Sequence, residues 1–197
     1  LVENPYEPGS TDWTDLFARF KQLASTEPAI ADVSAGNGKF GPHYSRNGHL
    51  INGERVLLYQ ITVDTHYFAF MHIRKKAGRF FSPDRASDTA YLNVQPEQVL
   101  DGTSIVNRAV VVNNELYQLL GRPTLDEINP SLGARIIGVC DDYQFLDATQ
   151  KVAPAYHVIS RHGFKYWYAR INPGVEIPGT VHQIKKDWDL LTGKQPF

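Results

Sequence analysis

Apolar residues recur at helical spacing near both ends of the chain. After Thr11 and Asp12, either of which can cap a helix, they fall three or four residues apart, at Trp13, Leu16, Phe17, Phe20, Leu23 and Ala24. The spacing returns before Gly193, at Val181, Ile184, Trp188 and Leu191. We therefore predict one amphipathic helix that ends near Pro28 and a second that ends at Gly193.

Runs rich in β-branched and aromatic residues predict strands between these helices. The predicted strands are 30–35, 55–63, 90–94, 109–112, 134–140, 155–160 and 165–171. Asn113 or Asn114 can cap a helix that runs to Leu120. Residues 66–73 predict a short helix or a turn. Residues 36–53, rich in Gly, Asn and His, predict a long irregular connection or a hairpin extension, and a turn at 162–163 joins the last two strands.

The order of these elements predicts an α+β fold with two lobes. Helix and strands of similar length occur at both ends of the chain, with a different set between them. The simplest organisation places residues 1–65 and 146–197 in one discontinuous α/β lobe. Residues 66–145 then form an inserted α+β lobe.

The composition and charge of the chain argue against nucleic acid and anionic lipid as partners. Of the 197 residues 42% are hydrophobic and 12% aromatic, which is typical of a packed globular protein. Twenty basic and twenty-one acidic residues give a net charge of −1, so no global field recruits nucleic acid or anionic lipid. The sequence contains no apolar stretch of about 18 residues. Because the chain begins with Leu and shows no signal peptide, we expect a fragment of a larger protein.

The cysteine and histidine residues offer weak candidates for chemistry. Cys140 is the single cysteine and lies in an apolar run, which favours a buried small side chain over a reactive thiol. His66 and His72 lie near Asp64 but are not at the i, i+4 spacing of a helical metal site. A structural role is favoured over metal binding.

Other polar candidates also favour structural roles. His43 and His49 lie in the Gly-rich segment, where exposed turn residues are expected. Asp141 and Asp142 are adjacent, so in a strand they point to opposite faces, and we expect a strand-end cap or turn. No nucleophile elbow, phosphate loop or dinucleotide fingerprint is present. We therefore assign no catalytic, cofactor-binding or metal-binding residue.

The aromatic run near the end of the chain suggests a contact surface. Tyr166 and Tyr168 share a face of their strand and are expected to pack against the C-terminal helix. Trp167 then points away from that helix. Because exposed aromatic side chains often mark contacts, we predict an interlobe or subunit contact at Trp167.

Five blocks of sequence occur in a recognisable order. They are Val63-Asp64-Thr65-His66-Tyr67-Phe68 with Ile73, Gly78-Arg79-Phe80-Phe81, residues 109–121, residues 133–145 followed by Pro154, and Arg170-Ile171-Asn172-Pro173-Gly174. Over roughly residues 12–197 this order resembles the extracytoplasmic core domain of FtsX-like ABC transporter permeases, which include the MacB-like type. The segments 36–53 and 84–107 are longer than the corresponding segments expected for that family.

The resemblance implies an architecture and a setting. Residues 1–65 and 146–197 would form the Porter-like lobe and residues 66–145 the Sabre-like lobe. The domain would lie between transmembrane helices of the same chain, on the periplasmic side of the bacterial inner membrane. It would carry out no chemistry, need no cofactor, and transmit motion driven by a separate cytoplasmic ABC ATPase. The implied partners are a second permease copy and a periplasmic protein or substrate.

Two other functions stay open from the sequence. An extracellular ligand-binding or sensor domain could hold a small molecule between its lobes. A metal-dependent enzyme would bind metal through His66. The sequence identifies neither the cargo nor the number of such domains in the parent protein.

Overall fold

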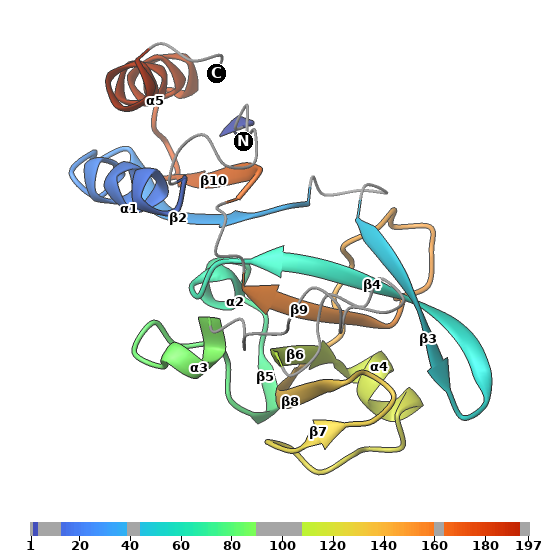
Figure 1. Cartoon of the computed structure of the whole chain (residues 1–197). Helices are drawn as coiled ribbons and strands as arrows, with labels where there is room; N and C mark the ends of the chain where they lie inside the picture. The colour runs from blue at the N-terminus through green and yellow to red at the C-terminus, as the bar shows by residue number, and fades with distance from the viewer. Residues whose placement is uncertain (1, 4–12, 39–43, 90–107, 160–163, 194–197) are drawn as a thin grey trace. The chain divides into compact units, whose positions relative to one another are not determined.

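The computed structural model describes residues 2–3, 13–38, 44–89, 108–159 and 164–193, shown in colour in Figure 1. The chain divides into two compact units. Unit 1 consists of residues 1–37 and 160–197, and unit 2 of residues 38–159. Both ends of the chain therefore belong to unit 1. Among the described residues, no helix has the length and apolar character needed to cross a membrane.

Unit 1 packs two helices against a small antiparallel sheet. The helices are α1 (Trp13–Ala24) and α5 (Ile177–Thr192). The sheet has the order β1 (Val2–Glu3), β10 (Tyr166–Ile171) and β2 (Ile30–Gly36). Its core contains Phe20, Trp167 and Trp188. The two amphipathic helices and the strand at 30–35 are confirmed.

Both ends of α5 have the side chains that helix ends require. At its start the Glu176 carboxylate accepts a hydrogen bond from the Gly179 backbone N–H at 2.6 Å, and Pro178 occupies the first turn. At its end Gly193 adopts the left-handed conformation, with φ 65° and ψ 37°. The helix therefore ends where the sequence predicts. The caps expected at Thr11 or Asp12 lie outside the described residues.

Unit 2 is built on a mixed sheet with three short helices. Its strands are β3 (Ser45–Ile51), β4 (Glu54–Val63), β5 (Lys75–Gly78), β6 (Ala109–Asn113), β7 (Ile128–Asn129), β8 (Ala134–Cys140) and β9 (Ala155–Ile159). The helices are α2 (Tyr67–Phe70), α3 (Ala86–Thr89) and α4 (Asn114–Leu119). The order is β4-β9-β6-β8-β5, with β3 paired to β4 and β7 to β8. The β4–β9 and β6–β8 pairs are parallel and the others antiparallel, which confirms an α+β fold.

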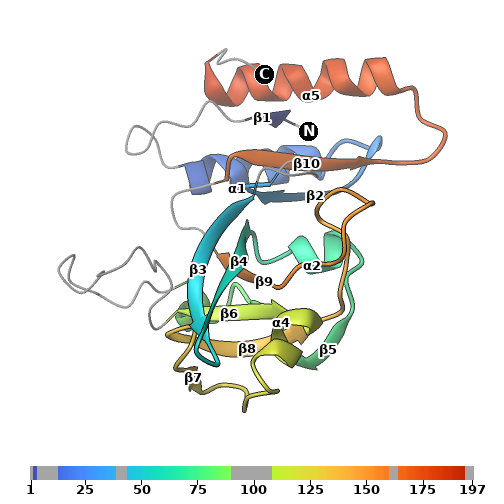
Figure 2. The ribbon, with the colours of Figure 1, turned by 90° about the vertical axis from the view of Figure 1, so that its right-hand side faces the viewer.

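A tight hairpin joins β3 and β4, the long strand pair in Figure 2. Its two turn residues, Asn52 and Gly53, both have positive φ, at 52° and 83°. This is the signature of a type I′ turn, whose twist matches that of the flanking strands. For the second half of the segment 36–53, the hairpin alternative is therefore correct and the irregular connection is wrong.

The last two strands do not pair with each other as a turn at 162–163 would suggest. β9 pairs with β4 and β6, whereas β10 pairs with β1 and β2. The compact units divide near residues 37 and 160, since β4 and β9 pair within unit 2, and the lobe boundaries at 65 and 146 stay a prediction. The assignment of Porter-like and Sabre-like lobes stays a prediction. The turn and the predicted strand 90–94 lie outside the described residues.

Asn113 joins three elements of unit 2 through one buried amide. Its side-chain oxygen accepts hydrogen bonds from the N–H of Leu116, at 3.1 Å, and of Ala155, at 2.9 Å. Its amide nitrogen donates to the carbonyl of Ala153 at 2.9 Å. The first bond caps α4, as predicted, and the other two fix the entry to β9 beside the end of β6.

Two of the five sequence blocks, one containing Gly78 and the other Gly138, lie next to each other in the structure. Gly78 has φ 63° and turns the chain at the end of β5, so that the Arg79 N–H donates to the Ile137 carbonyl at 2.9 Å. A Cβ atom on Gly138 would collide with the Arg79 carbonyl. Arg79 in turn holds Asp88 through two bonds, of 2.6 and 2.8 Å. The glycines therefore permit a backbone contact that positions the loop after β5.

We expect Gly138→Ala to lower the free energy of unfolding by about 3 kcal/mol, because backbone and not a flexible side chain occupies the space. Gly174→Ala is the control. Gly174 has positive φ, 79°, and nothing lies within 4 Å of the added Cβ, so only about 1 kcal/mol of backbone strain is expected there. Urea unfolding of the two variants measures both values, and equal losses would contradict the close approach.

Candidate interaction surface

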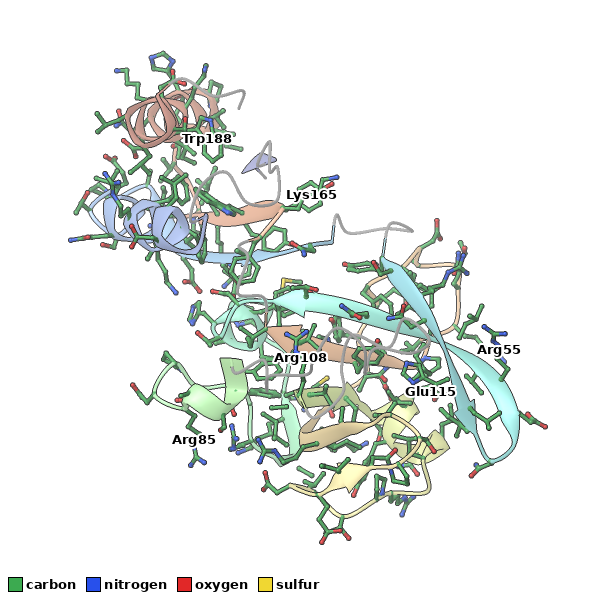
Figure 3. The ribbon with its side chains drawn as sticks, in the orientation of Figure 1. Arg55, Arg85, Arg108, Glu115, Lys165 and Trp188 are labelled. Atoms are coloured by element: carbon green, nitrogen blue, oxygen red, sulfur yellow. The ribbon has the colours of Figure 1, made fainter. Side chains whose placement is uncertain are left out.

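Trp167, the residue predicted to form a contact surface, lies in the core of unit 1. Its side chain is 1% exposed and its ring centroid lies 4.9 Å from Phe20 and 5.1 Å from Trp188. In Figure 3 Trp188 points from α5 toward β10. The prediction of an exposed aromatic contact at Trp167 is therefore wrong.

The error is a reversed assignment of the two faces of β10. In the β2–β10 register, Trp167 lies opposite Ala35 and Tyr168 opposite Ser34. Ala35 belongs to the core beneath the helices, so Trp167 shares that face. Tyr166 and Tyr168 lie on the other face and are also buried. The prediction that side chains alternate along β10 is correct. The prediction that the helices cover the face with Tyr166 and Tyr168 is wrong, since they cover the face with Trp167.

The histidines proposed as alternative metal ligands do not form a metal site. His66 precedes α2, and His72 follows it in the left-handed region, with φ 53°. No group of three or more His, Cys, Asp or Glu side chains that could hold a metal occurs among the described residues. The arrangement gives no support to a metal-dependent enzyme.

His49 is buried and not an exposed turn residue as expected. It lies in β3 on the face that packs inward, where its Nδ1 is 3.3 Å from the Ser131 carbonyl oxygen. Burial lowers its pKa, against the opposing effect of that carbonyl. Side chains of β3 alternate between the two faces of the hairpin, and His49 shares the buried face with Ile51. His43 lies outside the described residues.

Asp141 and Asp142 have structural roles at the end of β8, as predicted. Asp142 accepts a hydrogen bond from the Glu115 N–H, at 2.8 Å, in the first turn of α4. Asp141 accepts from Arg74 Nε, also at 2.8 Å. The two carboxylates are therefore committed to different elements and do not form an acid–base pair.

A chain of buried polar groups that the sequence did not reveal runs through unit 2. His157, which is fully buried, contacts the Val111 carbonyl through Nδ1 at 3.0 Å and the Tyr143 hydroxyl through Nε2 at 2.7 Å. A carbonyl can only accept, so Nδ1 carries the proton and Nε2 accepts from Tyr143. Tyr143 also bonds with Tyr67. Burial lowers the pKa of His157 to about 4.

Cys140 is confirmed as a buried side chain at the end of β8. Burial, reinforced by the charge of Asp142, raises the pKa of its thiol to about 12. The thiolate that nucleophilic chemistry needs is therefore absent near neutral pH. Both ring nitrogens of His157 are also occupied, one by the Val111 carbonyl and the other by the Tyr143 hydroxyl.

The outer side of the β3–β4 hairpin has a different character. Six residues share it, paired across the strands as Arg46 with Tyr59, Gly48 with Leu57 and Leu50 with Arg55, and we call them the hairpin face. Leu50 is 67% exposed and Leu57 55%. The opposite side of the hairpin carries the buried His49, Ile51 and Leu58. The hairpin face is therefore the candidate interaction surface of unit 2.

Solved structures of transporter domains share the fold of this chain. The periplasmic region of MacB from Actinobacillus actinomycetemcomitans matches it with a TM-score of 0.54 at 14% identity, over 91% of this chain and 75% of that one. The extracellular domain of the noncanonic ABC-type transporter YknZ from Gram-positive bacteria matches with a TM-score of 0.57 at 12% identity, over 98% and 90%. No known family and no curated protein matches the sequence.

These matches confirm the predicted resemblance at the level of the fold. They extend over nearly the whole chain, so they include both units. The chain therefore has the α+β fold of the periplasmic and extracellular domains of ABC transporters.

The His157 environment predicts a loss of stability in acid. Its pKa falls from 6.5 when unfolded to about 4 when folded, so the unfolded chain binds more protons between these values. The stabilisation is present above pH 6.5 and is lost as the pH falls toward 4. At pH 4.5 we expect His157 to lower the free energy of unfolding by about 2 kcal/mol relative to pH 7.

Urea unfolding at both pH values measures this effect. Because carboxylates also titrate in acid, the share of His157 is the difference between the wild type and His157→Gln, whose loss should be smaller by that amount. His182→Gln, at an exposed position of α5, should behave like the wild type. Equal losses in the wild type and His157→Gln would contradict the prediction.

Proposed function

We propose that this chain is a non-catalytic extracytoplasmic domain of an ABC transporter permease. The observation that supports this most is the fold shared over nearly the whole chain with the periplasmic region of MacB and the extracellular domain of YknZ. Three of the five sequence blocks agree with it, since one residue of each has a defined structural role. Asn113, Gly78 and Gly138 all determine backbone geometry.

The proposed role is the transmission of motion. ATP binding and hydrolysis by a separate cytoplasmic ATPase would move the membrane helices of the permease, and the domain would pass that motion to a substrate or a periplasmic partner. Such a part needs rigid units that move as bodies. The tightly paired sheets and the satisfied buried amide of Asn113 suit that role. A second permease copy completes the proposed assembly.

The proposed setting places the domain on the periplasmic side of the bacterial inner membrane, joined to transmembrane helices of its own chain. Sequencing the parent reading frame beyond Leu1 and Phe197 tests this directly. We expect apolar spans of about 20 residues close to each end. Their absence on both sides would remove the permease and leave an extracellular ligand-binding or sensor domain, which a thermal shift with a specific small ligand would then support.

We expect the isolated chain to bind no nucleotide. The proposal assigns ATP to a different subunit or domain, and the sequence lacks a phosphate-binding loop. Titration with Mg-ATP, followed by calorimetry and by the thermal unfolding midpoint, should leave both unchanged. A purified ABC ATPase subunit measured in parallel is the positive control. Saturable binding to the isolated chain would contradict the assignment.

A further inference from the structure

We propose that the hairpin face docks an extended segment of a partner protein that presents an apolar side chain between carboxylates. This inference goes beyond the proposed function, because it depends only on residues of the β3–β4 hairpin. It would hold for a permease domain and for a sensor domain alike.

The apolar part of the hairpin face is a continuous strip. Leu57 lies opposite Gly48, and Leu50 follows Gly48 by two positions on the same side of β3, so the two leucines are diagonal neighbours. Tyr59 follows on the same side of β4, where it is half-buried and its ring centroid lies 5.5 Å from that of the buried Phe145. Both leucines are more than half exposed, whereas their neighbours on the inner side are buried. The inner face of the hairpin packs into the core, but the outer face also carries the apolar side chains of Leu50 and Leu57.

Two arginines lie within this strip. The Arg46 guanidinium lies 5.8 Å from the centre of the Tyr59 ring. Arg55 points outward from the hairpin in Figure 3. Neither makes an ion pair with any residue that the structure describes. Other arginines of unit 2 do have acceptors, since Arg74 bonds to Asp141 and Arg79 to Asp88. The charge of the hairpin face thus matches a partner that supplies carboxylates.

Gly48 provides the space for Arg55 to lie across the strands. A Cβ atom at Gly48 would come 2.9 Å from Arg55 Nε and 3.2 Å from its Nη2. The Arg55 side chain therefore reaches from β4 over Gly48 and stays exposed. Its planar set of N–H donors can pair with a carboxylate of a partner segment. Arginine and tyrosine are also the residue types that dominate binding energy in protein interfaces.

The geometry favours a protein over a membrane. A hairpin that inserts into lipid needs apolar residues at its tip, but the tip here is Asn52 and Gly53. The leucines lie on the outer side of the strands and not in the turn itself. β3 pairs with β4 alone among the described strands, so an extended segment can lie along it. Contact with the side of the hairpin is therefore the expected mode.

The test selects binders for the full 197-residue chain from a phage-displayed library of random dodecapeptides. We expect the enriched peptides to place an aliphatic or aromatic residue between Asp or Glu residues. Resynthesised peptides should bind at least about tenfold more weakly to Leu57→Ser and to Arg55→Gln, measured by fluorescence anisotropy. Because both side chains are exposed, the thermal unfolding midpoints of the variants should match that of the wild type.

A charge exchange sharpens the test. The double variant Arg46→Glu and Arg55→Glu should lose the acidic peptides and gain their counterparts in which Lys replaces Asp and Glu. Ile177→Ser, which changes an equally exposed apolar residue in unit 1, is the matched control and should bind like the wild type.

Three results would overturn the proposal. The first is enrichment of peptides without acidic residues, or binding that Leu57→Ser does not change. The second is binding of the chain to phosphatidylglycerol vesicles that the same substitutions abolish, which would identify a lipid surface. The third is concentration-dependent dimerisation in sedimentation that Leu57→Ser abolishes, which would identify a second copy.

Discussion

The buried amide of Asn113 is the constraint on which much of unit 2 depends. It ends β6, begins α4 and fixes the entry to β9, using its oxygen twice and its nitrogen once. An apolar residue of similar size would leave the buried N–H groups of Leu116 and Ala155 without this acceptor, and each costs about 1–3 kcal/mol. It would also remove the donor to the half-buried Ala153 carbonyl. Aspartate could accept the two N–H bonds but would oppose the Ala153 carbonyl with a second acceptor. Only a side chain that both donates and accepts meets all three elements.

Other polar side chains in unit 2 also form hydrogen bonds with groups of the same unit. His157, Tyr143 and Tyr67 form a chain that begins at a backbone carbonyl, and Asp88 is held by Arg79 and by the Ser82 N–H. Burial alone would raise the pKa of Asp88, but these hydrogen bonds outweigh it and lower the pKa. These groups therefore have partners within unit 2, whereas His49 Nε2 and Arg135 Nε are buried without a hydrogen-bond partner among the described residues.

The sequence predicted elements better than it predicted faces and pairings. The helices ending at Gly193 and beginning after Asn113 were predictable because caps and apolar spacing are local signals. The exposure of Trp167 was wrongly predicted because alternation along β10 does not say which side the helices cover. The hairpin face was missed although Asn52-Gly53 is a strong turn signal, because the flanking Gly and His residues obscured the alternation around it. The hydrogen bonds of His157 join residues that are far apart in the sequence, so no local pattern could predict them.

The membership of both chain ends in unit 1 also determines the order in which the protein can form during synthesis. β2 lies near the start of the chain, but its partner β10 lies beyond the whole of unit 2. The described strands β3 to β9 belong to unit 2, which is complete once residue 159 has been made. Until then α1 and β2 hold an incomplete core without Trp167 and Trp188. Helix α1 is therefore made before unit 2, but its core is complete only after Trp188 has been made.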